Sequence, residues 1–133
     1  MRVVLDTNIL ISACLKPDGL EARVVAMALS GKVEACVTGA IVDEYDEVLR
    51  RRKFHAVQDC AESLLTRLRG CSRLVVTTET LFVATDEDDN RFLECVAAAG
   101  AEYLITGNLR HYPAEYGTAR VVNARSFMEF VLS

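Results

Sequence analysis

Short apolar runs alternate with longer segments of helical periodicity along most of this sequence, and this alternation constrains the fold more than any other feature. Runs rich in Val, Leu and Ile are typical of fully buried strands, and strands that alternate with helices predict βαβ units. The predicted strands are residues 2–5, 33–38, 74–77, 103–106 and 120–122, and the predicted helices are residues 21–29, 40–53, 56–68, 89–99 and 124–132. We therefore predict an α/β fold, a three-layer α/β/α sandwich with a mainly parallel sheet of four to five strands.

The chain has 133 residues, the usual length of one domain, and we expect a single domain over residues 1–133. It contains no apolar run near the roughly 18 residues that span a membrane, and no signal peptide is recognisable, so we expect a cytoplasmic protein without a membrane partner. The net charge of −4 argues against a broadly basic nucleic-acid-binding surface. It does not exclude a nuclease, because a divalent cation would offset clustered carboxylates.

Polar residues follow two of the predicted strands. The opening MRVVLDTNIL ends its apolar run at Asp6, and a later run ends in Thr106, Gly107 and Asn108. In open α/β sheets, sites form in the crevice beyond the carboxyl ends of the strands. From its neighbouring residues alone, Asp6 is better explained as the N-cap of a helix that starts near residue 7 or 8 than as a functional residue. The two roles are compatible.

The helix predicted over residues 40–53 carries four acidic residues near its start. Helical periodicity turns Asp43 and Glu47 away from the apolar face and puts Glu44 and Asp46 on its opposite edges. Two candidates therefore remain for a carboxylate half-buried beside the sheet. The acidic residues early in the helix and the basic residues late in it also match the helix dipole. The dipole alone is therefore sufficient to explain this charge pattern.

A third acidic group, Asp86, Glu87, Asp88 and Asp89, crowds the start of the helix predicted over residues 89–99. Four consecutive acids exceed what helix capping requires, and a bound cation would relieve their repulsion. Carboxylates from separate elements that meet at one crevice predict a site for a hard cation, Mg²⁺ or Mn²⁺. Such ions assist phosphodiester hydrolysis.

Three segments in order, LDTNIL, AIVDEYDEVLRRRKF and DEDDNRFLECVAAAGAEYLITGN, resemble the PIN-domain family. The similarity is greatest to VapC-like toxin components of bacterial and archaeal toxin–antitoxin systems. The resemblance implies a ribonuclease that binds one or two Mg²⁺ or Mn²⁺ ions and cleaves an RNA substrate. It also implies a cognate antitoxin protein as a partner and a tendency to form homodimers.

The resemblance also implies roles for individual residues. Asp6, Glu44 and Asp89 match the catalytic, metal-binding acids, and Asp86 is the alternative to Asp89 in the acidic run. Three further residues match positions that support the site: Asn8, Thr106 and Asn108. Many PIN domains have an aspartate in place of Asn108, and because asparagine adds no negative charge, a second ion would bind less tightly here.

Five basic residues could contact the RNA backbone or be ordinary solvent-exposed charges: Arg51, Arg52, Lys53, Arg110 and His111. Two other functions are weighed against the nuclease. A haloacid-dehalogenase-type phosphatase is disfavoured because it requires a second aspartate where this chain has Asn8. A non-catalytic module that binds RNA or a protein on the same fold is slightly favoured by Asn108 and by the negative net charge.

Overall fold

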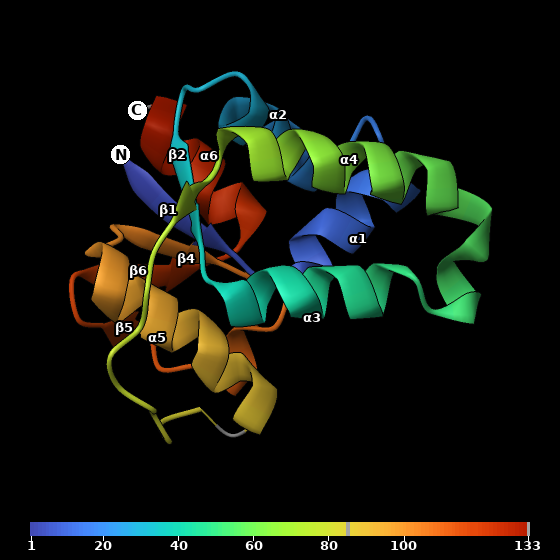
Figure 1. Cartoon of the computed structure of the whole chain (residues 1–133). Coiled ribbons are helices and arrows are strands. Elements are labelled where there is room, and N and C mark those ends of the chain that lie inside the picture. Colours follow the sequence, from blue (N-terminus) through green and yellow to red (C-terminus); the bar gives the residue numbers. More distant parts are fainter. Residues whose placement is uncertain (85, 133) are drawn as a thin grey trace.

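A computed structural model describes residues 1–84 and 86–132 and has the predicted α/β architecture (Figure 1). The strands form a six-stranded sheet in the order β3-β2-β1-β4-β6-β5, parallel except for the β5–β6 pair. In chain order the elements are β1 (Arg2–Leu5), α1 (Thr7–Leu15), α2 (Leu20–Leu29), β2 (Glu34–Val37), α3 (Gly39–Leu49), the 3₁₀ helix η1 (Arg52–Val57), α4 (Gln58–Cys71), β3 (Arg73–Leu74), η2 (Glu87–Asp89), α5 (Asn90–Ala99), β4 (Tyr103–Ile105), η3 (Leu109–His111), β5 (Glu115–Tyr116), β6 (Ala119–Val122) and α6 (Ala124–Leu132).

The sheet has more strands than predicted, and β2, β3 and β4 are shorter than the predicted strands, β3 most of all. The two-residue strand β5 forms a hairpin with β6, and Gly117 in the turn adopts a positive φ of 56° that few other residues tolerate. Strand β3 stops early because its neighbour β2 ends where Thr38 caps helix α3. The last contact along this edge is the hydrogen bond from the Val75 N–H to the Val37 carbonyl, 2.8 Å long.

Helices lie on both faces of the sheet. Helix α5 packs on β1, β2 and β4, whereas α2 packs with α1, α4 and α6. Figure 1 shows α5 in front of the sheet and α6 behind it. The connections from β1 to β3 run toward one edge of the sheet, and the later connections run toward the other edge. Because crossovers between parallel strands are right-handed, this change of direction places helices on both faces. The result is the predicted α/β/α sandwich.

The direction of the connections changes between the central neighbours β1 and β4. Leu5 pairs with Ile105 at the carboxyl ends of these strands, so the next residues, Asp6 and Thr106, emerge side by side. Open α/β sheets bind their ligands at such a switch point. The fold therefore places the two predicted polar strand ends side by side at this switch point, the place that we call the crevice.

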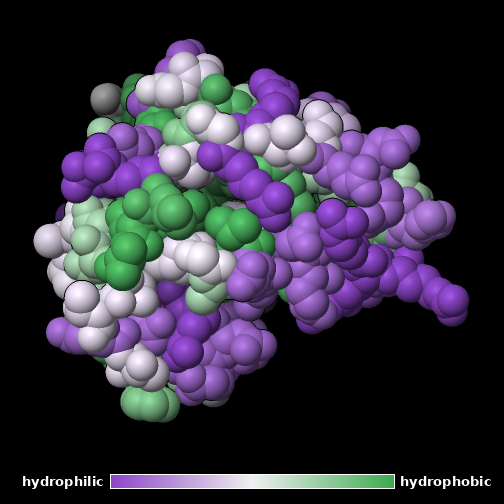
Figure 2. Space-filling view, viewed as in Figure 1, coloured by the Kyte–Doolittle hydropathy of each residue, from purple (hydrophilic) through white to green (hydrophobic). Residues whose placement is uncertain are grey.

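The face of the molecule in Figure 2 is largely polar, with an apolar patch beside the place where β3 and the following segment lie in Figure 1. None of the helices in the described residues combines the length and the apolar content needed to cross a bilayer.

Candidate active site

Asp6 lies at the centre of the crevice and is only 5% exposed. One of its carboxylate oxygens, Oδ2, accepts a hydrogen bond of 2.8 Å from the Thr106 hydroxyl and one of 3.0 Å from the Tyr112 hydroxyl. Asp6 does occupy the N-cap position of α1, but its side chain makes no capping hydrogen bond. The carboxylate is therefore held by residues about one hundred positions away rather than by its own helix.

Asn8 and Thr106 join the ends of β1 and β4. The Asn8 Oδ1 atom accepts a hydrogen bond of 2.8 Å from the Gly107 N–H, and its amide nitrogen lies 3.5 Å from the Thr106 hydroxyl oxygen. Gly107 permits this approach, since a Cβ atom there would lie 3.3 Å from Asn8 Oδ1. The Asn108 N–H donates to the Thr106 hydroxyl at 3.0 Å, and the Asn108 side chain is exposed. Asn108 thus contributes its backbone to this network.

Glu44 and Asp46, which periodicity could not distinguish, lie in different surroundings. Glu44 is half-buried, and its Oε2 atom accepts a short hydrogen bond from the hydroxyl of Thr7, the residue after Asp6. Asp46 instead faces two arginines, with 2.9 Å to Arg50 and 3.8 Å to Arg69. Of the two acids, the structure brings Glu44 to the crevice.

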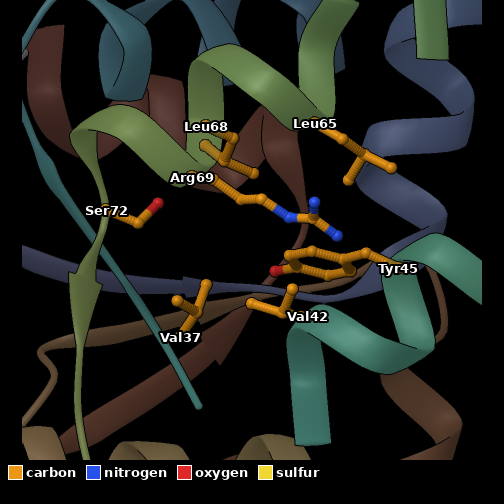
Figure 3. Close-up of a pocket in the computed structure, with 7 residues that line it drawn as sticks. All are labelled: Val37, Val42, Tyr45, Leu65, Leu68, Arg69 and Ser72. Atoms are coloured by element: carbon orange, nitrogen blue, oxygen red, sulfur yellow. The ribbon is translucent and has the colours of Figure 1, made fainter. Parts of the chain in front are cut away.

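Tyr45 anchors the helix that carries Glu44. Its buried hydroxyl donates a hydrogen bond to the Leu5 carbonyl, at the end of the strand that precedes Asp6. Figure 3 shows the Tyr45 ring beneath the guanidinium of Arg69, in a pocket with otherwise mostly apolar walls. This pocket has only about 10 Å³ of free volume and contains no carboxylate, so it serves to pack α3 and α4 against β2.

The acidic run before α5 turns one member inward. The Asp89 side chain is 13% exposed, and its Oδ2 atom lies 3.0 Å from His111 Nδ1. Asp86, Glu87 and Asp88 are exposed, and Asp86 uses Oδ1 to accept the Asp88 N–H at 3.0 Å. Asp89 is therefore the acid of this run that reaches the crevice, while Asp86 caps the turn η2.

The three inward carboxylates all have raised pKa values, and burial is the largest cause of each. Burial raises the pKa of Asp6, against the effect of the Thr106 and Tyr112 hydroxyls. Burial, followed by repulsion from Asp6 and nearby acids, raises the pKa of Glu44 from 4.5 to about 6. Burial and repulsion from Asp6 likewise raise the pKa of Asp89. Asp6 and Glu44 have no ion-pair partner among the described residues, whereas Asp89 faces His111.

Comparison with known proteins assigns the fold and the family. The sequence profile of the PIN domain matches residues 2–110. This chain belongs to the PIN-domain family. The chain is similar to the uncharacterized protein MJ1680 of Methanocaldococcus jannaschii, with 27% identity over 111 residues that cover 81% of this chain and 71% of that protein.

The fold of this PIN domain has a counterpart among solved structures. A chain in the crystal structure of VapBC2 from Rickettsia felis bound to a DNA fragment from their promoter superposes with a TM-score of 0.58. The match covers 91% of this PIN domain and 98% of that chain, at 14% sequence identity. At this identity the likeness extends to the fold. PIN domains are generally nucleases and typically use divalent metal ions.

The donor set of this PIN domain fits such an ion chemically. Asp6, Glu44 and Asp89 offer carboxylate oxygens, the ligands that Mg²⁺ and Mn²⁺ prefer, and their mutual repulsion is of the kind that a cation relieves. Within residues 1–84 and 86–132, no three His, Cys, Asp or Glu side chains form a ready-made metal-binding group.

The predicted RNA-contacting residues divide into two places. Arg51 pairs with Glu47 at 2.9 Å, and Arg52 and Lys53 are exposed in η1. Arg110 and His111 line an open cleft of about 460 Å³ beside Asn108. The cleft borders the crevice, because His111 is also the partner of Asp89. The His111 imidazole thus faces an acid of the site, a contact that the sequence analysis does not anticipate.

Three other residues that organise the site are absent from the sequence analysis: Thr7, Asn90 and Tyr112. Asn90 is 1% exposed, and its Oδ1 atom accepts the N–H groups of Val83 (2.9 Å) and Ala84 (2.7 Å), which ties the preceding loop to α5. The only local signal for Tyr112 is a polar-tipped aromatic residue soon after the strand end at Thr106, and many ordinary loops share it.

Proposed function

We propose that this PIN domain is a metal-dependent endoribonuclease that hydrolyses RNA phosphodiester bonds with Mg²⁺ or Mn²⁺. The proposal is supported above all by Asp6, Glu44 and Asp89, which come from three separate elements near the switch point of the sheet, where the charge of Asp6 acts on both other acids. Carboxylates with raised pKa values cluster at functional sites. Membership of a family of nucleases supports the same reading.

In this proposal Asp6, Glu44 and Asp89 hold the ion, and Asp86 adds negative charge nearby. A bound divalent cation supplies Lewis-acid assistance and charge neutralisation to phosphodiester hydrolysis. The chain's own contribution is orientation: the hydroxyls of Thr106 and Thr7 direct the oxygens of Asp6 and Glu44. Residues that orient metal ligands through hydrogen bonds typically change metal affinity by about 10–100-fold when replaced.

RNA binding is proposed for the basic residues on the two sides of the crevice. Arg110 lines the open cleft beside it, and Arg51, Arg52 and Lys53 follow the helix that carries Glu44. Lysine and arginine side chains bind the phosphate backbone through charge, which makes this part of the affinity salt-dependent.

The test is cleavage of single-stranded RNA by the purified protein with Mn²⁺, with chelator as the blank. The variant Asp6→Asn should reduce cleavage by about 100-fold or more, because it removes a charge at the centre of the site. Asp43→Asn, which changes an exposed acid on α3, is the matched control and should cleave as the wild type does. Equal cleavage by wild type and Asp6→Asn would assign the activity to a contaminant or to another site.

A non-catalytic binding module is the second candidate, and Asn108 and the net charge of −4 favour it. Titration of Mn²⁺ against thermal stability separates the two. A ligand that binds the native state raises the melting temperature, by a free energy of about 2.7 kcal/mol at one hundred times its Kd. An unchanged melting temperature at millimolar Mn²⁺ would favour the module.

We further propose the toxin of a type II toxin–antitoxin system as the biological role, with an antitoxin protein as the partner. The family and the VapBC2 structural likeness support this role. Co-expression with the product of the adjacent gene should suppress RNA cleavage and yield a stable complex. Full cleavage by the co-expressed proteins would contradict the role and leave the nuclease proposal intact.

A further inference from the structure

Two of the cysteines, Cys14 and Cys60, meet at a place outside the acidic crevice. Cys14 lies in the last turn of α1 and is only 5% exposed, whereas Cys60 lies in the first turn of α4 and is exposed. Helices α1 and α4 pack against each other (Figure 1). Both cysteines line the same cavity, which has a free volume of about 270 Å³. The packing of two helices thus brings together thiols that are far apart in the sequence.

The two thiols also contact each other. Burial raises the pKa of Cys14 to about 12, and a hydrogen bond with the Cys60 thiol and the charge of Cys60 add to this effect. A disulfide bond requires two side chains that point toward each other, and a shared hydrogen bond provides this orientation. Joining the two sulfur atoms therefore needs only a short further approach of the side chains.

The other three cysteines lack this combination of contact and access. Burial, and then the charge of Cys36, raises the pKa of Cys95 to about 12, but both of these residues are 0% exposed. Cys71 is exposed, its Sγ atom donates to two backbone carbonyls, and it has no thiol partner among the described residues. The pair of Cys14 and Cys60 joins one thiol that solvent reaches to one that it does not.

The cavity beside the pair can admit a small oxidant. Its free volume of about 270 Å³ far exceeds the roughly 30 Å³ that one water molecule takes up. Apart from the two thiols, Ser63 and Arg67, its walls are apolar. Hydrogen peroxide is little larger than water and fits such a space. Cys60 is therefore the thiol that an oxidant meets first, and Cys14 stays protected until it reacts with Cys60.

We propose that Cys14 and Cys60 are a redox-active pair, which hydrogen peroxide oxidises to a disulfide between α1 and α4. In the first step the Cys60 thiolate attacks a peroxide oxygen and the O–O bond breaks. Cys60 becomes a sulfenic acid, and the departing hydroxide takes up the proton that Cys60 lost. In the second step the Cys14 sulfur attacks the Cys60 sulfur, the S–O bond breaks, and the hydroxyl leaves with the Cys14 proton as water. Two thiols lose two electrons in total, and one peroxide is reduced to two water molecules.

The disulfide ties together segments that flank the crevice. Cys14 lies near the end of the helix that begins with Thr7 and Asn8, and Cys60 begins the helix that follows η1. The loop that the bond closes contains α2, β2 and α3, and with α3 it contains Glu44. A cross-link that closes a long loop restricts the unfolded chain and so stabilises the folded one. The inference concerns residues outside the crevice and does not rest on the nuclease proposal.

The first test treats the reduced full chain with hydrogen peroxide, counts its free thiols and maps disulfide-linked peptides by mass spectrometry. Two of the five thiols should disappear, the mass should fall by about 2 Da, and the linked peptides should contain Cys14 and Cys60. Cys71→Ser, which removes the other exposed thiol, is the matched control and should form the same disulfide. A wild type that keeps all its thiols, or one that is linked through Cys71 or between two copies, would overturn the proposal.

The second test separates the roles of the two cysteines, with Cys71→Ser as the background. Cys60→Ser should slow the loss of thiols to peroxide at least about tenfold, because the remaining cysteines are buried. Cys14→Ala should leave Cys60 as a sulfenic acid that dimedone traps, since the thiol that reacts with it is gone. Equal rates of thiol loss with and without Cys60, or no trapped sulfenic acid in Cys14→Ala, would refute the order of the two steps.

The third test asks whether the folded protein accepts the bond without distortion. The oxidised wild type should melt about 5 °C or more above the reduced protein, because the bond closes a long loop. Dithiothreitol should abolish the difference, and Cys60→Ser should show none. A melting temperature that is unchanged or lower after the disulfide has formed would show that the bond distorts the packing of α1 on α4, and that the pair is not built for it.

Discussion

Replacement of Glu44 by glutamine should stabilise the metal-free protein, even though we propose Glu44 as a metal ligand. Burial, and then repulsion from Asp6 and other acids, raises the pKa of Glu44 from 4.5 to about 6. A carboxyl group with a higher pKa in the folded state binds more protons folded than unfolded, so stability falls as the pH rises through this window. Above pH 6 the ionised carboxylate therefore destabilises the fold, and a neutral amide would not.

The pKa values set the size of the effect. A rise of about 1.5 units corresponds to about 2 kcal/mol at ~1.4 kcal/mol per unit. Glu44 is only half-buried, and solvent screening reduces this to about 1 kcal/mol. In a domain of this size, that equals a rise in melting temperature of about 3 °C. Glutamine keeps an oxygen that can accept the hydrogen bond from Thr7, so the substitution changes mainly the charge.

The assay is urea unfolding of wild type and Glu44→Gln in chelator, at pH 8 and pH 4. The gain of about 1 kcal/mol should be present at pH 8. It should vanish at pH 4, where the Glu44 carboxyl is mostly protonated in the folded state and in the unfolded state. Glu47→Gln lies on the same helix, exposed and paired with Arg51, and should change stability by less than about 0.5 kcal/mol. A Glu44→Gln protein that is less stable than wild type at pH 8, or equally stabilised at both pH values, would refute the reasoning.

Three further predictions test the surroundings of the site. Tyr112→Phe removes the donor to Asp6 and should lower stability by about 1–2 kcal/mol in urea unfolding at pH 8 and weaken Mn²⁺ binding by about tenfold, measured by calorimetry. Asn108→Asp adds a charge beside the crevice and should tighten Mn²⁺ binding by about tenfold, and looser binding would contradict it. Asn90→Ala leaves two backbone N–H groups without their acceptor and should cost about 2–3 kcal/mol in the same unfolding assay, whereas a loss below 0.5 kcal/mol would show that the loop finds new partners.

The elements that could be predicted from the sequence are those whose own residues determine them. The helix predicted over residues 124–132 has those bounds in the structure, and β1 matches residue for residue. The predicted strands differ from the structure where pairing with a neighbouring strand determines whether a strand forms and where it ends. Strand β3 is shorter than its apolar run because β2 ends beside it, and β5 exists only because a turn at Gly117 brings it back against β6.

The same distinction applies to the site. Spacing left Glu44 and Asp46 open, and the choice depends on Thr7 and on Arg50 and Arg69, which lie on other turns or helices. The local preference for Asp6 as a helix cap placed it at the correct backbone position but gave its side chain the wrong partner. Hydrogen bonds across one hundred residues cannot be inferred from local spacing, because they depend on the register between β1 and β4.

The side-chain partners of Asp6, Glu44 and Asp89 determine both how each carboxylate is oriented and whether its charge is neutralised. Asp6 and Glu44 accept hydrogen bonds from hydroxyl groups, and neither has an ion-pair partner among the described residues. A hydroxyl orients a carboxylate without cancelling its charge, whereas an arginine would do both and compete with a cation for the same oxygens. Asp89 is paired with the imidazole of His111 at 3.0 Å. The chain therefore holds its carboxylates in place while leaving their charge to be neutralised from outside, and the stability gained by Glu44→Gln would measure what that arrangement costs the empty protein.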